Sequence, residues 1–225
     1  MDVYLVPLAR DRFECYFEAA DDEEPASAEG QGVFARLRAW FSAQLRDAER
    51  ARHLAPTDEP RSAMARVQRK LMRWIAERVT EQRLLWHLGR AESATLHAPD
   101  DLDPREAERV MRAAMRIDAD RHLTMLALHS VGLIVSLPVM VLPGPNVLGY
   151  FFTFTVVGHF LALRGARRGL SRVIWRVAPN ADLTALRGAW SLEAETRHGR
   201  IHEVADRLGL ERLATFVERM TTPTA

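Results

Sequence analysis

The chain has 225 residues, enough for one domain plus a membrane hairpin, or for two small domains at most. It carries 31 basic and 30 acidic residues, and a formal net charge of +1 excludes a polycation that seeks nucleic acid. The single cysteine, Cys15, excludes an internal disulfide and fits a reducing cytoplasm. Lys70 is the only lysine, a bias towards arginine that is typical of GC-rich bacterial genomes.

The first 20 residues predict a small β element. Residues 3–8 and 13–17 are short runs rich in Val, Tyr and Phe, which indicates two strands joined by a turn. An isolated hairpin is barely stable, so we expect it to pack on the helices or on a partner. Residues 21–32 are acidic and turn-rich, and they predict a solvated linker.

Residues 33–122 predict cytoplasmic amphipathic helices. Apolar side chains recur at helical spacing from residue 33, and a second basic helix is predicted over residues 62–88. Such helices either lie on an anionic membrane surface or pack on each other. A further helix begins after Asp103, because Asp103 is a favourable N-cap and Pro104 suits the first helical position.

Residues 123–163, which we call the apolar segment, contain no Asp, Glu, Lys or Arg. The turn Pro143-Gly144-Pro145-Asn146 cannot continue a helix, so the apolar segment predicts two helices joined by a tight turn. Each would reach about 25–30 Å, close to one hydrocarbon thickness. The predicted fold class is therefore mainly α, with a membrane-inserted helical hairpin, amphipathic cytoplasmic helices and the small N-terminal β element.

Arginines flank the apolar segment on both sides and predict its topology. By the positive-inside rule both chain termini are expected in the cytoplasm of a bacterium, with the turn at or near the far face of the inner membrane. A re-entrant hairpin would show the same charge pattern. The residues expected to determine this topology are Arg116, Arg121, Arg164, Arg167 and Arg168.

Residues 164–225 predict cytoplasmic helices. The first is expected to run to about Val177 and to break at Pro179, and two more are expected over residues 183–197 and 201–220, the last interrupted or bent at Gly209. His198 and His202 are four residues apart, but Gly199 indicates a helix end between them, so we predict no metal site. The sequence has no nucleotide-binding or nucleophile motif, and we expect neither an enzyme nor a cofactor.

His129 and His159 are the ionisable residues of the apolar segment. Each lies 12 residues from an end of the turn region, or about 18 Å along its helix, so both are expected at one level. Helix rotation is open, and so is the choice between two structural histidines and a proton-handling pair. Asn146 is the remaining candidate for the ion pathway, through its side-chain oxygen.

Two groups of residues resemble the mitochondrial potassium/proton exchange-related family. The first is Tyr4-Leu5-Val6-Pro7-Leu8 with Arg12 and Cys15-Tyr16, and the second is Leu142 to Asn146, Tyr150-Phe151, Gly158-His159 and Gly165-Ala166. One departure is Thr155, where mitochondrial members carry an arginine four residues before the motif histidine. The resemblance implies an inner-membrane protein connected with potassium/proton exchange.

A single hairpin cannot enclose an ion path, because carriers place the substrate between bundles of several helices. We therefore expect a role in monovalent cation/proton exchange as a homo-oligomer or as an accessory to another membrane subunit, in contact with lipid. Two alternatives stay open: a membrane scaffold or interaction protein that transports nothing, and a soluble helical protein with a buried hairpin.

Overall fold

The structure is a computed structural model, and it describes residues 1–18, 83–140 and 147–221. These residues form six helices and one four-stranded sheet, so the fold is α/β. The chain divides into two compact units. The sheet unit comprises Met1–Ala19, Arg90–Asp118 and Ala166–Ala225, and the helical unit comprises Ala20–Gly89 and Ala119–Gly165.

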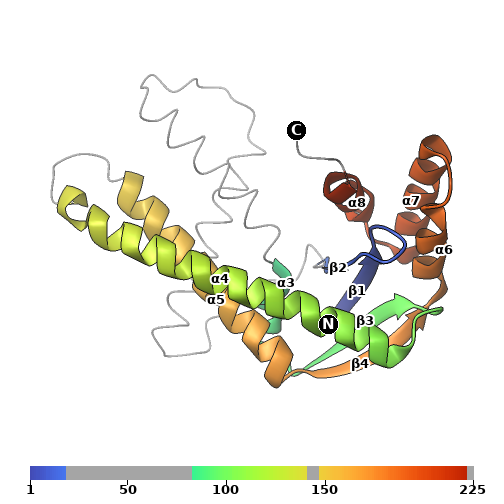
Figure 1. Cartoon of the computed structure of the whole chain (residues 1–225), viewed down its shortest axis with the longest axis horizontal. Helices are drawn as coiled ribbons and strands as arrows, with labels where there is room; N and C mark the ends of the chain where they lie inside the picture. Colours follow the sequence, from blue (N-terminus) through green and yellow to red (C-terminus); the bar gives the residue numbers. More distant parts are fainter. Residues whose placement is uncertain (19–82, 141–146, 222–225) are drawn as a thin grey trace. The chain divides into compact units, whose positions relative to one another are not determined.

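The sheet has the strand order β2-β1-β3-β4 (Figure 1). Its strands are β1 (Asp2–Pro7), β2 (Phe13–Tyr16), β3 (Ser93–Pro99) and β4 (Ile174–Asn180). β1 and β2 pair antiparallel, as the N-terminal sequence predicts, whereas β3 pairs parallel with both β1 and β4. The N-terminal hairpin is thus half of a larger mixed sheet.

β3 and β4 were not predicted. β3 buries Ala94, Leu96 and Ala98 in strand alternation, but two small alanines and one leucine give a weak strand signal. Pro179, expected to break a helix, instead lies in β4 at the edge of the sheet, where a missing N–H is tolerated.

Three helices pack on the β1–β2 hairpin in the sheet unit: α6 (Ala181–Ala189), α7 (Ala194–Leu208) and α8 (Leu213–Thr221) (Figure 1). The sequence predicted two helices in this region, whereas the structure has three. Gly209 ends α7 with φ 65°, and the Leu210 N–H donates to the Ala205 carbonyl at 3.0 Å. Gly199 lies inside α7, so the predicted helix end there is wrong. The buried core of this packing is Val6, Leu8, Tyr16, Leu186, Ile201, Val204, Ala205, Leu210, Leu213, Ala214 and Val217.

The remaining helices are α3 (Arg83–Leu88), α4 (Pro104–Met140) and α5 (Val147–Ser171). α4 begins where the sequence predicts, because Asp103 Oδ1 accepts the Arg105 N–H at 2.9 Å and the Glu106 N–H at 3.3 Å. α4 and α5 together carry the chain from β3 to β4.

The predicted fold class, mainly α with a membrane-inserted hairpin, is wrong. The fold is a mixed sheet with helices, and no helix among the described residues is both long and apolar enough to cross a membrane.

Several predicted features lie outside the described residues. They are the acidic linker at residues 21–32, the amphipathic helices expected before residue 83, and the turn Pro143 to Asn146.

Gly165 marks the closest approach between α5 and α3 in the helical unit. A Cβ atom built there would lie 1.6 Å from the Leu85 carbonyl oxygen, a distance that forces the backbone to move. Close packing against α3 therefore explains the glycine at position 165.

Gly165→Ala should lower the free energy of unfolding by about 1–3 kcal/mol, because the new Cβ atom would clash with the Leu85 backbone. The matched control is Gly188→Ala in α6, where the new Cβ meets nothing within 4 Å and the helix should gain up to about 1 kcal/mol. Urea unfolding of both variants measures the difference. Equal stability of the two variants would contradict the close approach.

Candidate functional site: a histidine cluster between two helices

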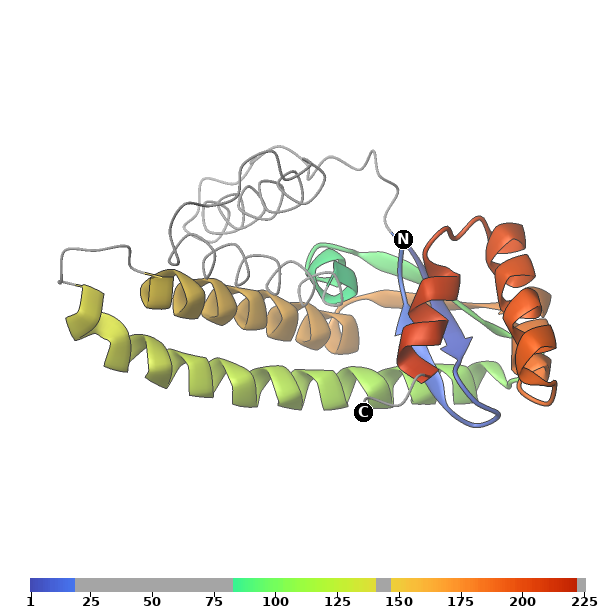
Figure 2. The same cartoon turned by 90° about the horizontal axis from the view of Figure 1, so that it is seen from above.

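In the helical unit, α4 and α5 run side by side (Figures 1 and 2). Gly132 of α4 allows this approach, since a Cβ at that position would lie 2.4 Å from the Phe152 ring of α5. Phe154, Val157 and Ala162 of α5 are buried. The two helices therefore pack closely enough for polar side chains on facing turns to touch.

The structure places the two predicted histidines in contact and adds a third. The His159 ring of α5 lies 5.1 Å from the His129 ring and 5.2 Å from the His122 ring, both on α4, measured between ring centres. We call these three residues the histidine cluster. Sequence reasoning missed His122 because it follows Arg121, one residue before the apolar segment begins.

His122 and His159 share a short polar contact. Their Nδ1 atoms are 2.9 Å apart. A hydrogen bond at this distance needs one Nδ1–H to donate and the other Nδ1 to accept, so the two rings carry different tautomers when both are neutral. A second proton on the accepting nitrogen would place two donors against each other. The pair therefore holds one proton between its Nδ1 atoms and resists a second there.

His129 has a defined tautomer as well. Its Nδ1 lies 2.7 Å from the Met125 carbonyl oxygen, which can only accept, so Nδ1–H donates. In the neutral ring this leaves Nε2 as the basic nitrogen. The ring edge also contacts Phe151 at 6.2 Å between ring centres. His129 can therefore take up a proton at Nε2 without losing its hydrogen bond to the helix.

The pKa of His122 is lowered to about 4, first by burial of the ring and then by the positive charge of Arg121. The residue is 8% exposed. Between pH 6.5 and 4 the unfolded chain binds a proton at residue 122 that the folded chain does not bind. The free energy of unfolding therefore falls as the pH decreases through this window, by up to about 3 kcal/mol.

The other predicted site residues are placed differently. Asn146 and the rest of the turn lie outside the described residues. Arg116, Arg121, Arg164 and Arg167 are exposed, and Arg168 donates from Nε to the Ala91 carbonyl at 3.3 Å, ahead of β3. The topological role expected for these arginines was tied to the membrane hairpin, which the fold overturns.

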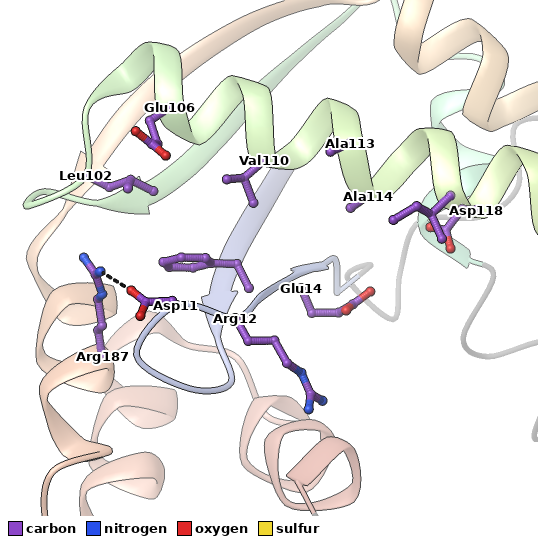
Figure 3. A pocket seen from close by; sticks show the side chains of 12 residues that line it. Asp11, Arg12, Glu14, Leu102, Glu106, Val110, Ala113, Ala114, Asp118 and Arg187 are labelled. Atoms are coloured by element: carbon purple, nitrogen blue, oxygen red, sulfur yellow. Dashed lines mark ion pairs between the residues drawn. The ribbon is translucent and has the colours of Figure 1, made fainter.

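The sheet unit contains an open pocket of about 480 Å³ (Figure 3). It lies between the β1–β2 turn, the first turns of α4 and Arg187 of α6, which pairs with Asp11 at 3.5 Å. The pKa of Glu14 is raised, mainly by burial and then by the negative charge of Asp118, although Arg12 opposes the shift. Sequence reasoning missed this pocket because its carboxylates come from distant parts of the chain. Its lining residues include Asp11, Arg12, Glu14, Glu106, Asp118 and Arg187.

These observations define an α/β protein in which two long helices, carrying a histidine cluster, connect adjacent parallel strands. Residues 2–173 match the family described as mitochondrial K+-H+ exchange-related, and the match covers most of the chain. The protein therefore belongs to this family, as the sequence motifs indicated. No curated protein and no solved structure gives a significant match. The family match includes the histidine cluster and ends before β4.

His122→Gln should reduce the acid-induced loss of stability between pH 6.5 and 4 by up to about 3 kcal/mol, because glutamine cannot titrate in this range. Urea unfolding of wild type and variant at several pH values measures the effect. His129→Gln, which leaves the His122–His159 pair in place, is the control and should keep the wild-type loss. Parallel pH profiles for wild type and His122→Gln would contradict the burial of a neutral His122.

Proposed function

We propose that this protein takes part in potassium/proton exchange as an accessory or oligomeric subunit at the bacterial cytoplasmic membrane. The observation that carries the proposal is the 2.9 Å contact between His122 and His159, in a chain that belongs to a K+-H+ exchange-related family. An exchange system needs groups that bind and release protons near neutral pH, and histidine is the side chain suited to this task.

The cluster supports a proton-handling role through its arrangement. The His122–His159 pair accommodates one Nδ1 proton. The His129 ring, whose basic nitrogen is Nε2, contacts the His159 ring. A proton that arrives at His129 has an imidazole neighbour on the facing helix. We propose that His159 exchanges protons with His129, while His122, whose pKa is lowered, stays neutral and shares the Nδ1 proton of the pair.

The cation would be bound largely by other groups. The apolar segment contains no carboxylate, so within it potassium could rely only on backbone carbonyls, hydroxyls or Asn146. This supports a subunit that works with a partner. The sheet-unit pocket has the carboxylates that the apolar segment lacks, and Glu14 there has a raised pKa.

One observation favours a second candidate, an interaction protein that moves no ions. α4 exposes a row of large apolar side chains, which we call the α4 apolar face; exposure of this kind is typical of binding surfaces. Its members are Leu123, Leu128, Val131, Ile134, Val135 and Leu137, with exposed fractions of 45% or more.

The direct test is potassium-driven proton movement in membrane vesicles from bacteria that express the chain, compared with matched vesicles that lack it. His159→Gln keeps hydrogen-bonding capacity but cannot titrate, so it should reduce the potassium-dependent proton flux to the level of vesicles without the chain. His97→Gln, on β3 in the sheet unit, is the matched control and should retain the flux.

Two results would count against the proposal. Full flux in His159→Gln at equal protein abundance would remove the histidine cluster from proton handling. Equal flux in vesicles with and without the wild-type chain would favour the interaction protein.

A further inference from the structure

A second cluster of potential ligands lies on the C-terminal helices of the sheet unit. His198 and His202 are one turn apart on α7, with ring centres 4.6 Å apart, and Glu218 approaches them from α8. Glu218 Oε1 lies 2.9 Å from His198 Nδ1 and 3.5 Å from His202 Nε2. One potential ligand atom from each residue lies within 4.8 Å of the others.

These distances fit a tetrahedral transition metal. Zinc binds histidine nitrogen at about 2.0–2.1 Å and carboxylate oxygen at about 2.0–2.2 Å, so two ligand atoms of a tetrahedral site stand about 3.3–3.5 Å apart. One observed nitrogen–oxygen distance, 2.9 Å, lies below this range, and the other, 3.5 Å, lies at its upper end. Small side-chain rotations would bring the three atoms around one ion.

The backbone under the three ligands is fixed by the hydrophobic core. Ile201 and Val204 of α7 and Val217 of α8 are buried, and the Gly209 turn sets the angle between the helices. Glu218 Oε1 is itself shielded from solvent, so it is directed at the histidines rather than outward. The two histidine side chains are 62% and 52% exposed, which leaves an open path for an ion and for water as a further ligand.

Two nearby arginines are engaged elsewhere. The guanidinium of Arg197 lies over the Trp190 ring at 5.2 Å, and Arg200 pairs with Glu203 at 2.7 Å. These contacts hold both arginines, and the Glu203 carboxylate offsets the positive charge of Arg200.

From this geometry we propose that His198, His202 and Glu218 form a binding site for a divalent transition metal of the zinc class, which links α7 to α8. Two neutral imidazoles and one carboxylate are a donor set that zinc accepts, with water completing the coordination. The site lies beyond residue 173, where the family match ends, and it is independent of the exchange function proposed above.

The test uses the full chain, purified without a histidine tag, treated with a chelator and then titrated with Zn²⁺ by calorimetry. The wild type should bind one equivalent, and zinc should raise its thermal midpoint, because an ion that binds only the folded state stabilises it. His202→Gln and Glu218→Gln should each weaken this binding by at least about tenfold and lose the zinc-dependent rise.

Two matched variants serve as controls. Glu211→Gln, in the exposed connection between α7 and α8, and His97→Gln, on β3, should both bind zinc like the wild type. All three ligand side chains are partly exposed, so circular dichroism of the variants should match the wild type. Wild-type affinity in both His202→Gln and Glu218→Gln, or no stoichiometric binding by the wild type, would overturn the proposal.

Discussion

The parallel pairing of β3 with β4 is the constraint on which the rest of the structure depends. Their register runs without interruption from Ser93 opposite Ile174 to Pro99 opposite Asn180. Parallel strands cannot be joined by a tight turn and need a long crossover. Here α4 and α5 are that crossover, so the apolar segment belongs to a connection between two neighbouring strands. β4 then leads directly into α6, because Asn180 Oδ1 accepts the backbone N–H groups of Asp182 and Leu183.

Close helix packing explains how the three histidines come into contact within this crossover. Gly132 admits the Phe152 ring, and Gly165 admits the backbone of α3 at Leu85, so small residues occur where neighbours approach most closely. Three imidazoles then share the facing turns of α4 and α5. Burial lowers the pKa of His122, and a neutral His122 and a neutral His159 can share one proton between their Nδ1 atoms. In this account proton handling depends on helix packing, and cation binding depends on groups outside the apolar segment.

Local signals in the sequence were sufficient for some elements and insufficient for others. The Asp103 cap, the Gly209 helix end and the two N-terminal strands follow from short-range chemistry, and all form as expected. β3 and β4 are stabilised by pairing between segments about 80 residues apart, which no local pattern encodes. The level of His129 and His159 followed from counting residues, whereas the contribution of His122 depends on helix rotation, which the sequence left open. Gly199 suggested a helix end, but packing of Ile201 and Val204 in the core keeps α7 continuous and aligns His198 with His202.

The central claim is that His122 and His159 hold one Nδ1 proton between them. Nitrogen-15 NMR of the histidine-labelled protein at neutral pH tests it most directly, with His122→Gln used to assign the two rings. The account predicts that one ring of the pair carries a protonated Nδ1 and the other a bare Nδ1, with a measurable coupling across the hydrogen bond. Two rings in the same tautomer, with no coupling between them, would contradict it.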